Sequence, residues 1–350
     1  MEAWKTERVK ELLLEAFDSA SLPIQRLYGA KILITGGCGL IGKMMVRMLA
    51  AINERDKLNM SLILPVRDTG RANAMFAQDQ GRISMRMIEQ DLTKGISWPE
   101  ELDYVIHGAS ITQSQAMVDH PLEVISINVE GTKYVMELAA QKAVKSAVYL
   151  SSMEVYGFTT QEELLDETNL KYVNPLLVRS CYPESKRMAE NLCIAYMHEC
   201  GVPVRIIRLG QTFGYGVEKN DSRVFAEFAR CVRDGKDIRL LTPGDSTRMY
   251  LDTIDAVTGI LTVLLKGKDG EAYNAANSDT YCSIVDMAHL IVDTLSKGHS
   301  KVVYSEKGNT LSQFSPPHRL RLDTEKIEAL GWKPITSLTS MYDRLMEEME

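Results

Sequence analysis

Tyr182 and Lys186 stand four residues apart in the stretch RSCYPESKRMAE. If this stretch is helical, the two side chains emerge on the same face. A free tyrosine has a pKa of about 10 and is a poor base near neutrality, but a neighbouring ammonium favours its phenolate. The spacing therefore predicts that Lys186 lowers the pKa of Tyr182, which then exchanges protons with a substrate. The same spacing also occurs on ordinary helices with a core tyrosine and a solvated lysine, so the surrounding motifs must decide.

A glycine-rich turn, GGCGLIG, directly follows the apolar run KILIT and precedes a predicted helix. Glycines in a GxxGxxG arrangement permit a tight turn and a close approach of the backbone, and the unpaired N–H groups of a helix N-terminus attract a pyrophosphate. We therefore expect a dinucleotide, NAD or NADP, to bind at Gly36, Gly39, Leu40, Ile41 and Gly42. A tight strand-to-helix turn without a ligand is the alternative.

The elements that must position these residues alternate along the chain from Lys31 onward. The apolar runs are KILIT, SLILPV, ISMRMIE, YVIHGA, SAVYLSS and VRIIRL, and the predicted helices cover residues 44–51, 121–140 and 183–199. This alternation predicts an α/β fold with a Rossmann-type, doubly wound parallel sheet. We expect residues 30–210 to form the dinucleotide-binding domain with the catalytic residues. Residues 211–350 should mainly form a smaller C-terminal substrate-binding lobe, with some segments returning to the first domain.

An extra helix is predicted before this fold, within residues 1–29. Val9, Leu13 and Phe17 lie near helical spacing there and suggest an amphipathic helix docked on the main body. Binding to a membrane surface is the other interpretation, which the acidic residues of this segment disfavour.

The ends of the predicted strands add candidates for cofactor binding. Arg67 stands after the second strand, where an acidic residue would hold the ribose hydroxyls of NAD. An arginine there can face the 2′-phosphate of NADP or stack on adenine, or it is simply an exposed loop residue. After the third and fourth strands, residues suited to adenine binding and to close approach of the cofactor are Asp91, Leu92, Ala109 and Ser110.

Ser152 ends the fifth predicted strand, at the edge of the sheet where ligands bind. We expect it to hydrogen-bond the same substrate oxygen as Tyr182 and so to fix the hydride-bearing carbon against the nicotinamide. This position favours the acid–base interpretation of Tyr182 and Lys186.

The motifs GGCGLIG, SSMEVYG and YPESK, in this order, resemble the extended short-chain dehydrogenase/reductase family, the NAD-dependent epimerases and dehydratases. Within it, RSCYPESKRMAE, RLGQTFG, NDSRVF and DSTRMY are most similar to stretches of the UDP-glucuronate decarboxylase type of nucleotide-sugar enzyme. The likeness covers nearly everything from residue 30 to the end. It implies a nucleotide-sugar substrate and a homodimer built through the predicted helices 121–140 and 183–199.

The resemblance also implies roles for individual residues. Lys186 would hold the nicotinamide ribose, and Asn128 would support the hydrogen-bond network of the site. Glu154 matches a glutamate of the decarboxylases, although it equally suits a structural acid that caps nearby backbone. Arg223 and Arg248 match positions near the nucleotide and its pyrophosphate, which suits charge-assisted bonding to phosphate oxygens.

Two departures from the family pattern leave the sugar open. The 4,6-dehydratases carry Asp then Glu after the hydrogen-bonding residue, whereas this chain has Met153 then Glu154. A thioether cannot donate a proton to a leaving hydroxyl, so dehydration is disfavoured. Gln211, after Gly210, stands where relatives commonly place an asparagine beside the sugar nucleotide.

We therefore predict an NAD(P)-dependent enzyme that oxidises a nucleotide-linked sugar transiently to a ketone and then re-reduces it, with epimerisation or loss of carbon dioxide in between. One alternative is a net NADP(H)-dependent reductase or dehydrogenase of a nucleotide-linked sugar or alditol. A remote one is a non-catalytic regulator that senses the cofactor.

Composition narrows the partners and the location. The chain of 350 residues has a formal net charge of -7 and a pI near 5.6, which offers no general attraction for nucleic acid. Its six cysteines form no CxxC pair and its histidines show no ligand spacing, so we expect no metal. Without a recognisable secretion signal or a long apolar run, we expect a cytoplasmic protein with no membrane partner.

Overall fold

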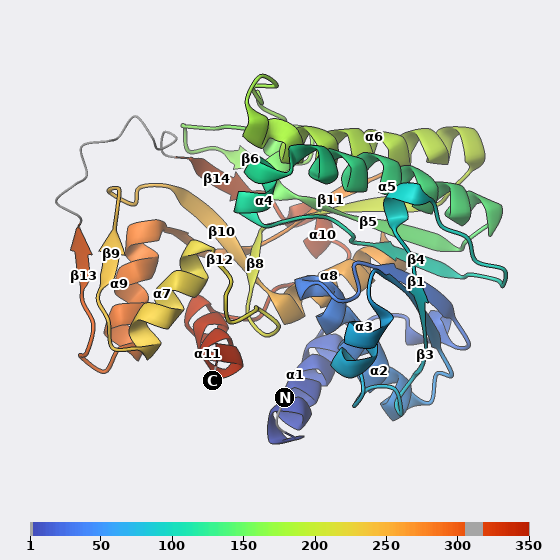
Figure 1. The fold of residues 1–350 in the computed structure, drawn as a ribbon, viewed down its shortest axis with the longest axis horizontal. Coiled ribbons are helices and arrows are strands. Elements are labelled where there is room, and N and C mark those ends of the chain that lie inside the picture. The colour runs from blue at the N-terminus through green and yellow to red at the C-terminus, as the bar shows by residue number, and fades with distance from the viewer. Residues whose placement is uncertain (1–2, 305–317, 350) are drawn as a thin grey trace.

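The computed structural model describes residues 3–304 and 318–349, and a seven-stranded parallel sheet forms its centre (Figure 1). The strands are β1 (Lys31–Thr35), β2 (Ser61–Val66), β3 (Ser84–Glu89), β4 (Tyr104–His107), β5 (Ser146–Ser152), β7 (Val204–Leu209) and β11 (Ala272–Ala275). Their order is β11-β7-β5-β4-β1-β2-β3, and every neighbouring pair is parallel. The predicted doubly wound sheet is confirmed, and its order reverses beside β1, where open sheets of this kind leave a crevice for a ligand.

Helices cover both faces of this sheet, so its inner strands are buried on both sides, as parallel strands usually are. The edge strand β3 remains partly exposed. On one face lie α2 (Leu40–Asp56), α3 (Thr69–Met75) and α8 (Thr253–Lys266); on the other lie α4 (Ser114–Asp119), α5 (Pro121–Gln141) and α6 (Cys181–Cys200) (Figure 1). Three short 3-10 turns stand next to these elements. They are η2 (Leu92–Lys94) after β3, η3 (Met153–Tyr156) after β5, and η4 (Val178–Ser180) before α6. The helices extend a few residues beyond the predicted ranges.

The predicted N-terminal helix is α1 (Ala3–Ser19), followed by the short turn η1 (Ile24–Leu27). Val9, Leu13 and Phe17 are buried in the core that α1 shares with α2 and α8. A salt bridge of 2.9 Å between Lys10 and Glu54 adds to this contact. The apolar face of α1 is therefore packed on the body of the protein. Over residues 3–304 and 318–349, no helix has the length and the apolar character that crossing a membrane would require.

The small lobe is built on a second, mixed sheet. This sheet comprises β12 (Asn277–Ser283), β10 (Thr247–Asp252), β14 (Arg319–Leu322) and β6 (Leu164–Leu165) in that order, with β8 (Gln211–Phe213) also paired to β10. Beside it lie the paired strands β9 (Ile238–Leu240) and β13 (Val302–Tyr304), and the helices α7 (Val224–Arg233), α9 (Ile284–Leu295) and α11 (Leu338–Met349). Packed rings of Phe213, Phe225, Tyr250 and Tyr342 fill the core of the lobe.

The chain passes between the two lobes more than once. β6 belongs to the first half of the sequence and yet joins the sheet of the small lobe. In the other direction, α8 and β11 return from the small lobe to the large sheet, followed later by the short helix α10 (Glu325–Glu328) beside β11. Because these segments cross between the lobes, the two lobes form one interlocked body with a cleft between them.

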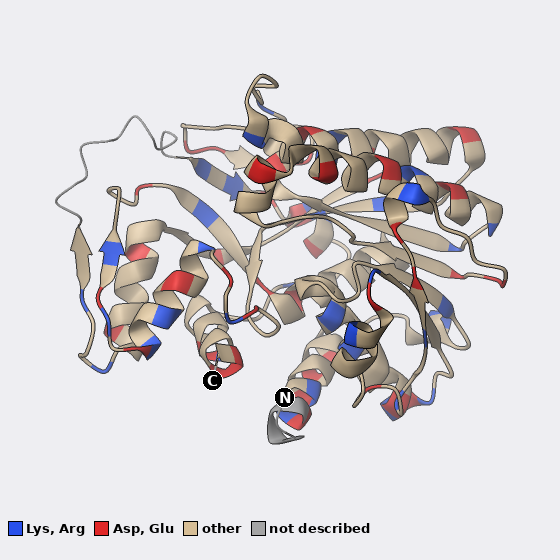
Figure 2. Cartoon of the chain, viewed as in Figure 1, with Lys and Arg blue, Asp and Glu red and all other residues tan. Residues whose placement is uncertain are grey.

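Figure 2 shows basic and acidic residues interspersed over the helices of both lobes.

Candidate active site

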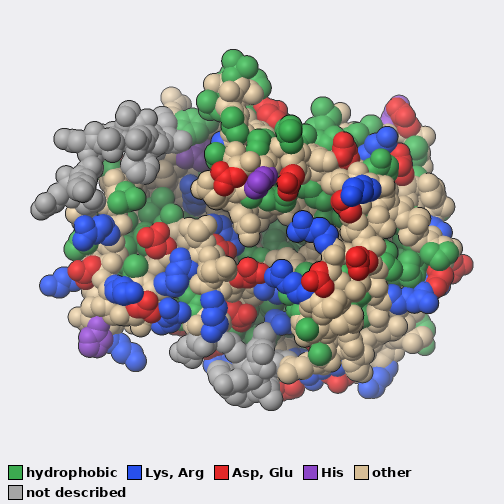
Figure 3. Space-filling model, in the orientation of Figure 1, with side chains coloured by type: hydrophobic (Ala, Val, Ile, Leu, Met, Phe, Trp, Pro, Cys, Tyr) green, Lys and Arg blue, Asp and Glu red, His purple; other side chains and the backbone are tan. Residues whose placement is uncertain are grey.

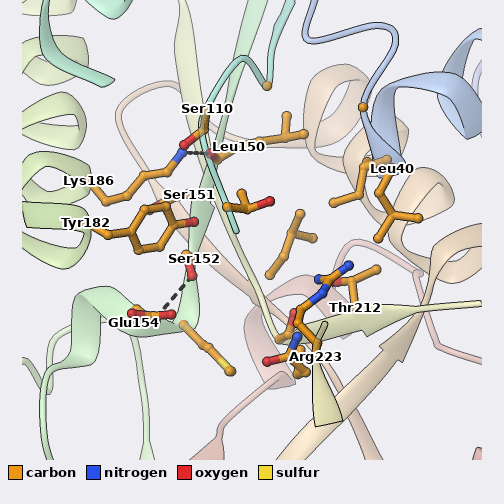
Figure 4. A pocket seen from close by; sticks show the side chains of 18 of the residues that line it. Leu40, Ser110, Leu150, Ser151, Ser152, Glu154, Tyr182, Lys186, Thr212 and Arg223 are labelled. Carbon is orange, nitrogen blue, oxygen red and sulfur yellow. Dashed lines mark hydrogen bonds between the residues drawn. The ribbon is translucent and has the colours of Figure 1, made fainter. Parts of the chain in front are cut away.

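A cleft of about 420 Å³ lies between the lobes and is lined by residues of both. Figure 3 shows the surface hollowed near its middle, and Figure 4 shows the side chains inside. Tyr182 and Lys186 point into the cleft from α6, beside Ser152 and Glu154, and Arg223 faces them from the small lobe. The cleft therefore brings together the catalytic candidates and the residues assigned to the nucleotide.

The glycine-rich turn closes one end of the cleft. A Cβ atom on Gly42 would lie 2.1 Å from the carbonyl oxygen of Gly36, and one on Gly36 would lie 2.8 Å from the backbone of Gly108. Gly36 also has a φ of +72°, which favours glycine. Helix α2 begins directly after Gly39 without a side-chain cap, so its first N–H groups are free to meet an anion. The turn thus has the form that a bound pyrophosphate requires.

Tyr182 and Lys186 are both almost fully buried, with exposed fractions of 6% and 2%. The Lys186 ammonium donates to the carbonyl oxygen of Leu150 at 2.8 Å and lies 5.9 Å from the centre of the Tyr182 ring. Ser152 ends β5 and its hydroxyl accepts the N–H of Glu154 at 3.2 Å. Tyr182, Lys186 and Ser152 therefore lie in one cleft, as the sequence predicts.

In the protein alone, the net shift of the Tyr182 pKa is opposite to the predicted one, because burial outweighs the nearby positive charges. Burial raises the pKa of Tyr182 above its ordinary value, and the carboxylate of Glu154 raises it further. The hydroxyl of Ser152 and the charge of Arg179 oppose this rise only in part. Burial also lowers the pKa of Lys186, to about 8. Desolvation disfavours the charged form of each group, and sequence spacing carries no information on burial.

An ion pair that the sequence did not predict stands next to the phenol. The guanidinium of Arg179, in η4, donates to both carboxylate oxygens of Glu154 at 2.9 Å. Its Cζ atom lies 5.8 Å from the centre of the Tyr182 ring, and both members of the pair line the cleft. Arg179 stands three residues before Tyr182, and this proximity was the only signal in the sequence.

Asn128 lies behind the cleft wall, with 1% of its surface exposed. Its side-chain oxygen accepts the hydroxyl of Ser110 at 2.7 Å, and its amide donates to Ser185 at 2.9 Å. Ser110 lines the cleft, and Ser185 precedes Lys186 on α6. Asn128 thus connects the strand end after β4 with the helix that carries the catalytic candidates.

Several predicted cofactor residues lie outside the cleft lining. Arg67 is exposed at the end of β2. Asp91 accepts the N–H and the hydroxyl of Thr93, at 3.0 Å and 2.8 Å, and so caps η2. Leu92 is buried in the core. The N–H of Ala109 donates to the hydroxyl of Thr35, at the end of β1. The ends of the inner strands β1, β4 and β5 line the cleft, whereas the described lining includes no residue of β2 or β3.

The small-lobe side of the cleft carries Gln211, Arg223 and Arg248. Arg223 is paired with Asp221 at 2.6 Å and lies over the ring of Phe225 at 4.7 Å. The Nε atom of Arg248 is buried and has no hydrogen-bond partner in the described part of the chain. A buried, unpaired guanidinium nitrogen is costly unless a ligand meets it, so the residues present fit an anionic group at this end. Polar residues that the sequence did not single out also line the cleft: Thr112, Ser114, Thr212 and Ser222.

Among the described residues, no group of three or more His, Cys, Asp or Glu side chains is placed to hold a metal ion. His107, in β4, lies between the hydroxyls of Thr35 at 2.6 Å and Thr132 at 2.9 Å. Burial and the nearby Lys186 lower the pKa of His107 to about 3. It is a neutral core residue.

Comparison with known proteins decides the family. A sequence profile of the NAD dependent epimerase/dehydratase family matches residues 32–276. The chain belongs to this family.

Relatives in the NAD dependent epimerase/dehydratase family perform different reactions. UDP-glucuronic acid decarboxylase 1 of Xenopus tropicalis is 29% identical over 313 residues, which cover 88% of this chain and 69% of the relative. The dTDP-D-glucose 4,6-dehydratase of Homo sapiens is 27% identical over 317 residues, covering 88% and 86%. This chain is thus an enzyme of a family that includes nucleotide-sugar decarboxylases and dehydratases.

Solved structures show the same fold. A dTDP-glucose 4,6-dehydratase from Streptomyces venezuelae, with NAD bound, aligns with a TM-score of 0.71 at 22% identity, covering 91% of this chain and 95% of the other. A UDP-glucuronic acid 4-epimerase from Bacillus cereus, in complex with UDP-glucuronic acid and NAD, aligns with a TM-score of 0.70 at 20% identity, covering 91% and 98%.

Proposed function

We propose that this protein modifies a nucleotide-linked sugar by transient oxidation to a ketone, followed by re-reduction after epimerisation or decarboxylation. One observation supports this most strongly. A single cleft connects the glycine-rich turn, the Tyr182–Ser152 pair and the buried, unpaired nitrogen of Arg248. A cofactor pyrophosphate, a reacting hydroxyl and a substrate diphosphate would each meet a suitable group there.

The residues of the cleft divide the chemistry among them. Bound NAD supplies the hydride acceptor and donor. Tyr182 takes the proton of the sugar hydroxyl, and Ser152 hydrogen-bonds the same oxygen and so orients the reacting carbon. Lys186 stabilises the phenolate by its charge and holds the nicotinamide ribose. Arg223 and Arg248 bind the nucleotide diphosphate.

Dehydration is the member of this reaction class that the cleft supports least. Met153 lines the cleft next to Glu154, and its thioether has no proton to give to a leaving hydroxyl. Glu154 is engaged by Arg179. We therefore propose epimerisation or decarboxylation, with the sugar and the nucleotide to be identified by experiment.

A net NADP(H)-dependent reductase is the second candidate, and Arg67 is the observation that favours it. This arginine is exposed at the end of β2, where a 2′-phosphate would lie. Assays with NAD⁺ and NADP⁺ separate the two. Steady turnover of free cofactor, followed at the absorbance of the reduced nicotinamide, supports the reductase, whereas product formation without net change in that absorbance supports transient oxidation.

The first test combines substrate screening with Tyr182→Phe. The purified protein is incubated with UDP-, dTDP-, CDP- and GDP-sugars and NAD⁺, and the products are identified by mass spectrometry and NMR. Loss of the phenol hydroxyl should reduce turnover by about 10²- to 10⁴-fold, since a positioned acid–base group contributes this much, while NAD binding is retained.

Tyr28→Phe is the matched control, because Tyr28 is exposed and stands outside the cleft lining. It should leave turnover unchanged. Full activity of Tyr182→Phe on the substrate of the wild type would contradict the proposed role of the phenol.

A further inference from the structure

Helix α6 turns three polar side chains toward β5 at successive turns: Tyr182, Lys186 and Glu190. Each meets the end of the strand. Lys186 donates to the carbonyl oxygen of Leu150, and Ser151 donates its hydroxyl to Glu190 at 2.6 Å. Tyr182 stands next to Ser152 (Figure 4). Two of these contacts carry the proposed chemistry, and the third, at Glu190, lies one turn further from the cleft.

Glu190 is also held from the other side, by Arg208 on β7. The guanidinium donates to one carboxylate oxygen through Nε at 2.9 Å and to the other through Nη2 at 2.7 Å. Its remaining nitrogen donates to the hydroxyl of Tyr156 at 3.1 Å and to the carbonyl oxygen of Glu167 at 2.8 Å. Glu190 therefore has a fixed position relative to both β5 and β7.

The charges of this pair are almost completely removed from water, with exposed fractions of 8% for Glu190 and 5% for Arg208. Desolvating two charges costs so much that apolar residues of similar volume often serve stability equally well. Stability is therefore a weak reason for a charged pair at this place. Glu190 lies one helical turn after Lys186, which suggests that the pair acts on that lysine.

Resting on the proposed function, we propose that Glu190, anchored by Arg208, is a positioning residue that fixes α6 against β5 and keeps the Lys186 ammonium charged within the buried site.

The surroundings of Lys186 support this role for Glu190. The titratable groups facing the ammonium are His107 of β4, Tyr149 of β5, and Tyr182, Glu190 and Cys193 of α6. Burial keeps the imidazole, the phenols and the thiol neutral near pH 7, because it lowers the pKa of His107 and raises the pKa of Tyr149, Tyr182 and Cys193. Glu190 thus supplies the negative charge that opposes deprotonation of Lys186.

Two single variants should act differently on Lys186. Glu190→Gln keeps the shape and removes the charge, so the pKa of Lys186 should fall further below about 8. Loss of a near carboxylate lowers an ammonium pKa by roughly one unit or more. Arg208→Gln leaves the carboxylate with Lys186 as its nearest cation, so the pKa of Lys186 should stay or rise. A merely structural pair would give the same effect in both variants.

The pKa of Lys186 is measured directly by NMR on protein labelled with ¹³C-lysine, without substrate. The Cε signal of Lys186 is assigned by its disappearance in Lys186→Met, and its titration midpoint is compared among the variants. In parallel, the alkaline limb of the kcat–pH profile should move to lower pH in Glu190→Gln and not in Arg208→Gln. The NMR result stands even if no nucleotide sugar is turned over, so failure of this inference is distinguishable from failure of the proposed function.

Asp269→Asn is the control, because it breaks a second ion pair to β7, between Arg205 and the half-exposed Asp269 at 2.5 Å. It should leave the midpoint unchanged. If a single variant does not fold, as judged by thermal melting, the double variant Glu190→Gln, Arg208→Gln leaves no unpaired buried charge and should show the lowered midpoint of Glu190→Gln. An unchanged midpoint in folded Glu190→Gln, or an equal fall in Arg208→Gln, would overturn the proposal.

Discussion

The phenol of Tyr182 lies between two opposite charges. Glu154 raises its pKa and Arg179 lowers it, after the larger effect of burial. Because the phenolate is the base in the proposed reaction, activity should fall as the pH drops below the pKa of this phenol. The ion pair between Glu154 and Arg179 therefore sets part of the pH dependence of the enzyme.

Arg179→Met should raise the pKa of Tyr182 further, since it removes a positive charge and leaves Glu154 unpaired. The acidic limb of the kcat/KM–pH profile should move to higher pH by roughly one unit, whereas Glu154→Gln should move it to lower pH. Arg86→Met, at an exposed ion pair with Glu100, serves as the control without a shift. Shifts of the same sign in both cleft variants would contradict this account.

At the residue scale, sequence spacing predicts which side chains share one face of a helix. It does not predict how burial changes their pKa values. Tyr182 and Lys186 share a helix face because of helical geometry alone, so the sequence sufficed to place them. The pair of Arg179 with Glu154 joins segments 25 residues apart, and only the fold brings them together. The raised pKa of Tyr182 likewise depends on burial against Met117 and Val124, which no local pattern encodes.

We expect cofactor binding to depend most on the turn between β1 and α2. A side chain at Gly42 would displace the backbone of Gly36 and Gly37, which it would approach to 2.1 Å and 2.7 Å. We expect Gly42→Ala to destabilise the protein by about 1–3 kcal/mol, as overpacking does. It should also weaken NAD binding by roughly tenfold or more, because α2 can no longer begin at the same place.

Urea unfolding and fluorescence titration with NADH measure the two effects. The matched control is Gly81→Ala, because a Cβ atom at Gly81 has no heavy atom within 4 Å. Cofactor affinity equal to that of the wild type in Gly42→Ala would mean that the dinucleotide binds elsewhere.

Elements with a strong local pattern were predicted, and those that depend on distant pairing were not. The run KILIT and the helix after GGCGLIG carry both apolar periodicity and turn residues, so β1 and α2 follow from the sequence. β11 consists of the short stretch AYNA and becomes a strand because it pairs with β7, far away in the chain. β6 comprises only two residues and depends in the same way on β14.

At the scale of the whole molecule, Asp252 stands where β10 of the small lobe passes into α8 of the large one. It caps α8 and pairs with Arg344 at 2.7 Å, and its side chain is fully buried. Burial raises its pKa to about 7. Since the pKa is higher in the folded than in the unfolded chain, its contribution to stability is full below about pH 4 and is lost as the pH rises through about 7.

Asp252→Asn should remove this dependence and keep the cap, because asparagine also caps helices. The stability of the wild type relative to the variant should fall between pH 5 and pH 7 by at most about 1.4 kcal/mol per pH unit. Urea unfolding at several pH values measures the difference. Parallel stability curves for the two proteins would show that Asp252 is ionised throughout.

We propose that the protein forms a homodimer through the outer faces of α5 and α6. Leu122 and Ile125 on α5 and Met188 on α6 are exposed. Leu122→Glu and Met188→Glu should each shift the protein toward the monomer in light scattering after size exclusion. Leu241→Glu, on an exposed position of the small lobe, is the control. A monomeric wild type would refute the proposal.

The return of α8 and β11 to the large sheet has a consequence for biosynthesis. Strand β7 lacks its outer neighbour, and the apolar side covered by α8 stays open, until the ribosome has translated residue 275. A nascent chain that ends near residue 210 therefore exposes an unpaired strand edge and bare core residues, which are the features that attract chaperones and promote aggregation. The large sheet is therefore complete only after β8, α7, β9 and β10 of the small lobe have also been translated.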